Sequence, residues 1–170
     1  MAKPLADIAS VDPHGEFPFD LGTYFFNILL VAVRHRDARL EQLVRPIGLD
    51  LAMARALMVI HRLGSCTMNE LADYGATDRT TMTRIVDRLV RAELVKRDTP
   101  PRDRRKVVLC LTSAGVRSLA GTAELTMADN DGLLDGLPEH ELRAVARLMQ
   151  KVVSRMVDEP HVLKRVLWES

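Results

Sequence analysis

Residues 78–112, DRTTMTRIVDRLVRAELVKRDTPPRDRRKVVLCLT, decide the fold that this sequence predicts. Asp78 is of a type that favours the N-cap of a helix, and the residues after it show helical periodicity. The apolar side chains of one face are Met82, Ile85, Val86 and Leu89. The pattern therefore predicts a helix from Asp78 to about Ala92 that buries one face.

The second half of this stretch predicts a β-hairpin. Two short strands are predicted by the residue types at positions 94–98 and 106–111. Between them, Pro100 and Pro101 lack the backbone N–H that a strand ladder needs. We therefore expect residues 99–105 to form an exposed tip.

Positive charge is concentrated on this helix and hairpin. Residues 79–106 contain ten Lys or Arg and four Asp or Glu, a net charge of +6, whereas the whole chain of 170 residues carries +1. A nearly neutral protein with one strongly basic unit is suited to binding a polyanion with that unit. Duplex DNA is the leading candidate.

Two further helices and a short strand are expected before Asp78. Asp50 can cap a helix over residues 51–63, and residues 65–67 fit a brief strand ahead of a helix over 68–74. A tight turn over residues 75–77 then leads to Asp78. The core residues expected from the first of these helices are Leu51, Leu57, Met58 and Ile60.

A long helix is expected near the N-terminus. Residues 1–19 contain three prolines and predict an irregular arm. A helix should follow from Asp20 to about Arg45 and end before Gly48. Residues 24–33 are apolar nearly all the way round, and such a helix needs partners on more than one side. This indicates burial between two subunits.

The C-terminal part also predicts helices. Thr112 can cap a helix to about residue 134, in which Gly115 is an unfavourable residue. A strong helix over residues 138–157 and a short tail helix over 162–168 should follow.

The predicted fold is mainly α, with a winged helix-turn-helix core, N- and C-terminal dimerisation helices and a small β-hairpin wing. The expected divisions are an arm over 1–19, a dimerisation helix over 20–48, the DNA-binding domain over 49–112, and dimerisation helices with a tail over 113–170.

Composition and motifs argue against several other classes of protein, namely membrane proteins, secreted proteins, metalloproteins and enzymes. The longest apolar run, residues 24–33, is about half of a bilayer span, and no signal peptide is visible, so a cytoplasmic protein without membrane contact is expected. Neither cysteine spacing nor histidine spacing predicts a metal site or a cofactor. The sequence has no phosphate-binding glycine loop and no nucleophile elbow, so we do not expect an enzyme.

The predicted helix over 78–92 has polar side chains at its leading end, where recognition helices meet base edges in the major groove. The candidate DNA-binding residues on this helix are Arg79, Thr80, Thr81, Thr83, Arg84 and Arg88. Arg88 lies further along and is expected at a phosphate. At the hairpin tip, Arg102, Arg104 and Arg105 should reach the minor groove, and Asp103 should pair with a tip arginine.

The segments TRIVDRLV (83–90) and DRRKVVLCLTSAG (103–115) together resemble the signature of the MarR family of bacterial transcription regulators. The resemblance extends over residues 20–157. It implies a homodimer formed by the terminal helices, a pseudo-palindromic operator and, usually, repression. It also implies that Arg105 enters the minor groove and that Asp103 is its ion-pair partner.

Members of this family are often released from DNA by small anionic phenolic ligands, which implies a possible aromatic effector here. Such a pocket would lie between the dimer helices and the winged domain. The candidate effector-binding residues are Tyr24, Phe25, Arg39, Met58 and Arg62.

Several alternatives remain open. The arginines of the helix could serve only to solvate it, and the acidic Asp87 could pair with Arg91 or Arg84, or orient an arginine for DNA. Cys66 and Cys110 could form a thiol-based redox switch, although buried, inert thiols are the ordinary case. A winged-helix module for protein–protein contact would not require the basic segment.

Overall fold

The computed structural model describes residues 20–75, 77–99 and 106–157. The predicted N-terminal arm, most of the hairpin tip and the tail helix therefore lie outside the described residues. The chain divides into two compact units, Met1–Arg39 and Leu40–Ser170.

The described part of the first unit is helical and forms most of α1 (Leu21–Val44). Asp20 caps α1, because its Oδ1 accepts the backbone N–H of Thr23 at 2.7 Å. The same contact lowers the pKa of Asp20. The apolar run within α1 is largely exposed, with Leu21, Leu30 and Val31 all more than half exposed. The prediction of a helix with unpartnered apolar surface is confirmed within this chain.

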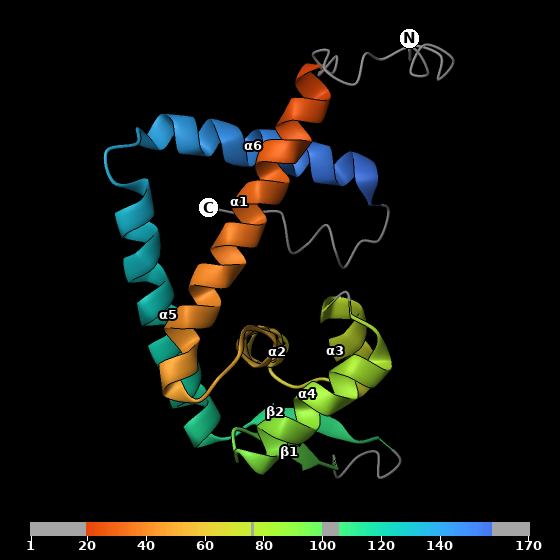
Figure 1. The fold of residues 1–170 in the computed structure, drawn as a ribbon. Helices are drawn as coiled ribbons and strands as arrows, with labels where there is room; N and C mark the ends of the chain where they lie inside the picture. The colour runs from red at the N-terminus through yellow and green to blue at the C-terminus, as the bar shows by residue number, and fades with distance from the viewer. Residues whose placement is uncertain (1–19, 76, 100–105, 158–170) are drawn as a thin grey trace, which may run out of the picture. The chain divides into compact units, whose positions relative to one another are not determined.

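The second unit contains the predicted winged helix-turn-helix core (Figure 1). After the 3-10 turn η2 (Arg45–Ile47), its elements are α2 (Leu51–Leu63), α3 (Met68–Gly75), α4 (Arg79–Arg91), β1 (Val95–Asp98) and β2 (Val108–Leu111). Asp50 and Asp78 are the predicted N-caps. Asp50 accepts the N–H of Met53 at 2.7 Å, and Asp78 accepts that of Thr81 at 2.9 Å.

The hairpin strands pair antiparallel, with Val95 opposite Leu111 and Asp98 opposite Val108. The strand expected over residues 65–67 is reduced to a single bridge between Cys66 and Leu109, which exchange backbone hydrogen bonds of 2.7 and 3.2 Å. This bridge joins the hairpin to the segment between α2 and α3.

The hydrophobic core lies where α2, α3, α4 and the hairpin meet, and Leu57, Ile60, Leu71, Leu89 and Leu109 are fully buried there. The prediction for Met58 was wrong, because this side chain is 52% exposed. Successive helical residues are about 100° apart, so the residue after Leu57 is turned away from the face that Leu57 and Ile60 bury.

Two long helices follow, α5 (Ser113–Leu134) and α6 (Glu139–Met156). Thr112 caps α5 as predicted, since its hydroxyl accepts the N–H of Gly115 at 3.0 Å. Within the described part of the chain, α6 has no buried residue, and Val145, Leu148 and Met156 are exposed. None of the helices among the described residues is long and apolar enough to cross a membrane.

Candidate nucleic-acid interface

Helix α4 has one buried and one exposed face. Met82, Ile85, Val86 and Leu89 are all less than a tenth exposed and pack into the core. This anchoring fixes the helix, so its opposite face is presented to solvent in a defined orientation.

The exposed face begins at the N-terminal end of α4. Arg79, Thr80, Thr81 and Arg84 are exposed, while Thr83 is half-buried. The hydroxyl of Thr83 donates to the carbonyl oxygen of Arg79 at 2.8 Å. Among the residues that the structure describes, the guanidinium groups of Arg79 and Arg84 have no carboxylate partner. Both groups can therefore meet an external anion.

Arg88 lies in a different environment from Arg79 and Arg84. Its Nη1 forms an ion pair with Oδ2 of Asp50, the residue that caps α2. One carboxylate thus holds the start of α2 with one oxygen and α4 with the other. The sequence indicated the capping role of Asp50 but not this second role.

Asp87 pairs with a strand residue rather than with a helix neighbour. Its Oδ1 accepts a hydrogen bond from Nη2 of Arg97 at 2.6 Å, whereas Arg91 donates through Nε to the backbone carbonyl oxygen of Asp87. The expected carboxylate pairing with Arg91 is therefore not formed. Arg97 was not among the predicted site residues, although β1 follows α4 closely enough to bring the two together.

The base of the hairpin carries exposed basic residues that are paired. Lys96 Nζ donates to Asp98 Oδ2 at 3.0 Å, which raises the pKa of Lys96 and lowers that of Asp98. Lys106 lies 3.9 Å from a carboxylate oxygen of Glu70. The predicted tip residues Arg102, Asp103, Arg104 and Arg105 lie outside the described residues.

The candidate effector residues occur in both units. Tyr24, Phe25 and Arg39 belong to the first unit, and Phe25 packs edge-on against Phe26 with ring centroids 5.3 Å apart. Met58 and Arg62 belong to the second unit and are exposed on α2.

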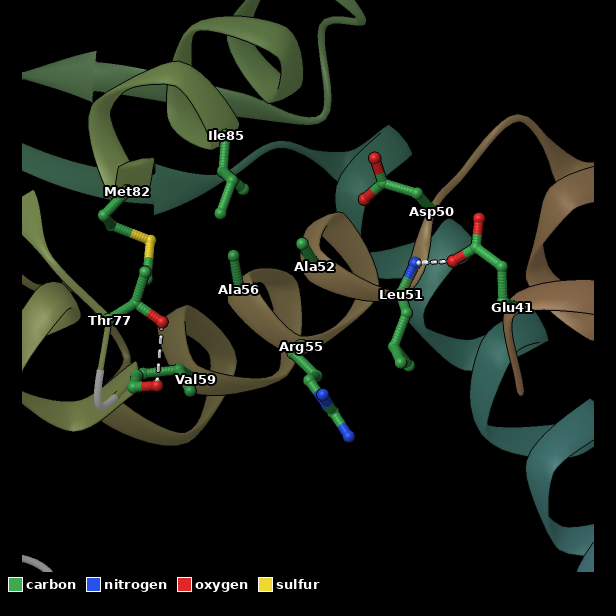
Figure 2. Close-up of a pocket in the computed structure, with 11 residues that line it drawn as sticks. Glu41, Asp50, Leu51, Ala52, Arg55, Ala56, Val59, Thr77, Met82 and Ile85 are labelled. Carbon is green, nitrogen blue, oxygen red and sulfur yellow. Dashed lines mark hydrogen bonds between the residues drawn. The ribbon is translucent and has the colours of Figure 1, made fainter. Parts of the chain in front are cut away.

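A cavity of about 490 Å³ lies within the second unit (Figure 2). It is lined by Glu41, Asp50, Leu51, Ala52, Arg55, Ala56, Val59, Gly75, Thr77, Met82 and Ile85. None of the five candidate effector residues lines it. Sequence periodicity could not reveal this cavity, because its walls come from α1, α2, the α3–α4 turn and α4.

The two cysteines are free thiols. Cys66 is buried, and its removal from water, together with the nearby Glu70 and Cys110, raises the pKa of its thiol to about 11. The reactive species is the thiolate, so Cys66 is held in its unreactive form at neutral pH. In the described residues, no group of three or more His, Cys, Asp or Glu side chains could hold a metal ion.

The MarR family model matches residues 49–107, which run from the start of α2 to the beginning of β2. This segment contains the whole exposed face of α4. Over these residues the chain is similar to the MarR family.

Relatives within the MarR family share about a quarter of their residues with this chain. The HTH-type transcriptional repressor IacR of Pseudomonas putida is 25% identical over 113 residues, 66% of this chain and 68% of its own length. NicR of Pseudomonas putida, also an HTH-type transcriptional repressor, is 26% identical and covers 83% of this chain and 89% of its own length.

The crystal structure of a mutant MarR from Escherichia coli complexed with operator DNA is similar to this fold. It has a TM-score of 0.67 and 25% sequence identity, and the match covers 79% of this chain and 99% of that chain. MarR-family members are transcriptional regulators, and this chain is a transcriptional regulator similar to them.

Proposed function

We propose that this regulator is a homodimeric repressor that reads its operator with the exposed face of α4. The observation that carries the proposal is the contrast along α4: Arg79 and Arg84 are exposed without a carboxylate partner in the described region, while the opposite face is locked into the core. A rigid helix with free guanidinium groups at its leading end suits direct readout of base edges.

Two relatives support repression, rather than activation, of transcription. IacR and NicR are transcriptional repressors, and a mutant MarR of Escherichia coli has been crystallised with operator DNA. By analogy, this chain should occupy an operator and lower transcription.

The residues proposed to meet DNA divide into two groups. On α4, Arg79, Thr80, Thr81, Thr83 and Arg84 would face base edges, because they occupy its first two turns. At the hairpin tip, Arg102, Arg104 and Arg105 would enter the flanking minor groove, with Asp103 paired to one of them. Arg88 is proposed mainly as a positioning residue, since Asp50 already binds its guanidinium.

A dimer is supported by apolar surface that a monomer leaves in water. Leu21, Tyr24 and Leu30 on α1 and Val145 and Met156 on α6 are each more than half exposed. Exposed apolar surface on this scale is typical of subunit interfaces. Two copies related by a two-fold axis would bind half-sites about 10 bp apart, centre to centre.

A small-molecule effector is proposed as the signal that releases the operator. The sequence-based candidates Tyr24, Phe25, Arg39, Met58 and Arg62 remain proposals. The redox alternative receives less support, because burial keeps Cys66 protonated.

The test is selection of bound fragments from random duplex DNA, followed by affinity measurements on the selected sequence. Arg84→Ala should weaken binding to that sequence by about 1–3 kcal/mol and relax the preference at one base pair. Arg105→Ala should lower affinity for all DNA sequences. It should also reduce the slope of log affinity against log salt concentration by about one.

Arg143→Ala is the matched control, because this exposed arginine of α6 is paired with Glu139. It should leave DNA affinity unchanged. If no fragment is enriched over the starting pool, the protein is not a sequence-specific DNA-binding regulator.

A further inference from the structure

The hairpin base, residues 95–98 and 106–111, carries three basic residues, and each of them lies beside a carboxylate. The pairs, with their N···O distances, are Arg97–Asp87 at 2.6 Å, Lys96–Asp98 at 3.0 Å and Lys106–Glu70 at 3.9 Å. The carboxylates come from three elements, since Asp87 belongs to α4, Asp98 to β1 and Glu70 to α3. Together these six side chains carry no net charge.

The leading end of α4 differs from the hairpin base. The guanidinium groups of Arg79 and Arg84 have no carboxylate partner among the residues that the structure describes. The net charge that the sequence concentrates on residues 79–106 is therefore unevenly available in the folded unit. It is unpaired at the leading end of α4 and neutralised at the hairpin base.

A partner this close cancels most of the attraction between a basic group and a phosphate. The Debye length is about 10 Å at 0.1 M salt, and the paired groups are only 2.6 to 3.9 Å apart. A phosphate that feels the cation therefore also feels the carboxylate. All six side chains are at least 40% exposed, and exposed pairs contribute little to folding. Their main effect is on the charge that DNA meets.

We propose that Glu70, Asp87 and Asp98 determine specificity, because they limit binding to DNA of unrelated sequence by neutralising the hairpin base. The proposal rests on the proposed DNA-binding function. Non-specific binding comes almost entirely from cations that neutralise phosphates, so each neutralised cation removes one such contact. The leading end of α4, which would read base edges, keeps its charge.

Removal of the three carboxylates should affect unrelated DNA more than the operator. On unrelated DNA the protein can bind in many registers, so a released cation can find a phosphate. On the operator, the contacts of α4 fix one register and orientation. A released cation then gains a contact only where a phosphate already lies within its reach. The ratio of operator affinity to non-specific affinity should therefore fall.

The experiment compares the selected operator with a duplex of unrelated sequence over a series of salt concentrations. Glu70→Gln, Asp87→Asn and Asp98→Asn remove the three charges and keep an oxygen that accepts the same hydrogen bonds. The triple variant should bind the unrelated duplex about ten-fold more tightly at 0.1 M salt, and the slope of log affinity against log salt concentration should steepen by about one for each cation that meets a phosphate. Its affinity for the operator should rise by a smaller factor.

Glu139→Gln is the matched control for Asp87→Asn. It removes one carboxylate and releases Arg143, but this pair lies on α6, outside the winged helix-turn-helix core. The control should leave the affinity for both duplexes unchanged, whereas Asp87→Asn alone should raise the affinity for the unrelated duplex. An equal gain in these two variants would show that the net charge of the whole protein sets the affinity, and would overturn the proposal.

A purely structural role for the pairs predicts the opposite result. If the carboxylates serve only to hold the hairpin in place, the triple variant should lose affinity for the operator and gain none for the unrelated duplex. That outcome also overturns the proposal. Circular dichroism checks that each variant is folded, and the three single variants decide the question if the triple variant is not.

Failure of the proposed function gives a different result. If the unmodified protein binds the operator and the variants leave non-specific affinity unchanged, only the role of the three carboxylates is wrong. If the unmodified protein binds neither duplex, the proposed function is wrong. Binding of the unrelated duplex by the triple variant would then still support neutralisation of the hairpin base, and no binding by this variant would overturn both proposals.

Discussion

Gly115 packs so closely against Leu94 that a Cβ atom on this glycine would lie 2.0 Å from the carbonyl oxygen of Leu94. The contact joins the first turn of α5 to the turn between α4 and β1. Thr112 strengthens the junction, because its hydroxyl donates to the carbonyl oxygen of Glu93 at 2.7 Å and its N–H donates to that of Leu94 at 3.0 Å. The C-terminal end of α4 is thereby fixed to the start of α5.

Gly115→Ala should destabilise the protein by about 2 kcal/mol or more, because the added methyl group overlaps a backbone oxygen that cannot rotate away. The measurement is urea unfolding followed by circular dichroism. Gly121→Ala is the control in the same helix, since a Cβ there meets no atom within 4 Å. That substitution should stabilise by about 0.5–1 kcal/mol. Similar values for the two variants would contradict the close approach at Gly115.

Glu93 is the non-glycine residue with a positive φ, 59°, in the described part of the chain. Left-handed backbone at a residue with a Cβ costs roughly 1–2 kcal/mol. Glu93→Gly should therefore raise the free energy of unfolding, by up to about 1 kcal/mol after the extra flexibility of the unfolded chain is subtracted. Ala92→Gly, at a φ of −81°, adds the same flexibility without relieving strain and should destabilise. Loss of stability in both variants would contradict the strain at Glu93.

The sequence predicted the described elements of the second unit because each carries strong local signals. Asp50, Asp78 and Thr112 are N-caps whose side chains accept the expected backbone N–H groups. Apolar periodicity located the buried face of α4 for the same reason. Such signals depend on a few neighbouring residues, so they can be read without knowledge of the tertiary structure.

The sequence did not predict features that depend on contacts between residues far apart along the chain. Gly115 was interpreted as an unfavourable helix residue, although the approach of Leu94 requires it. The pairing of Asp87 with Arg97 and of Asp50 with Arg88, and the cavity beside Asp50, arise from the packing of separate elements. Periodicity along one segment contains no information about these contacts.

Cys66 gives a prediction for alkaline pH. Its pKa is raised from 9.0 to about 11 in the folded protein, so between these values the unfolded chain releases a proton that the folded protein retains. The contribution of Cys66 to the free energy of unfolding is present at neutral pH and is lost as the pH rises from about 9 toward 11. Urea midpoints measured across this range should fall less steeply in Cys66→Ala than in the unmodified protein. Parallel slopes in the two proteins would contradict the burial of the Cys66 thiol.

In the folded protein at pH 8, mass spectrometry should also find slower alkylation of Cys66 than of the less buried Cys110.

Arg84 and Arg88 should differ in how they affect DNA binding, although both are arginines of α4. Arg88 pairs with Asp50, with side chains 48% and 27% exposed, so solvent limits the pair to about 0.5–1 kcal/mol of stability. Arg88→Ala should lower stability by roughly this amount and weaken DNA binding on every sequence, because α4 loses an attachment to α2.

Arg84→Ala should leave stability within about 0.5 kcal/mol and weaken binding mainly to the selected operator. A double-mutant cycle with Asp50→Asn distinguishes the two roles, since Asp50→Asn retains the cap on Met53 but removes the charge that holds Arg88. The effects of Arg88→Ala and Asp50→Asn on stability should be less than additive, whereas those of Arg84→Ala and Asp50→Asn should add. Additivity in both cycles would mean that the Asp50–Arg88 pair does not position the recognition helix.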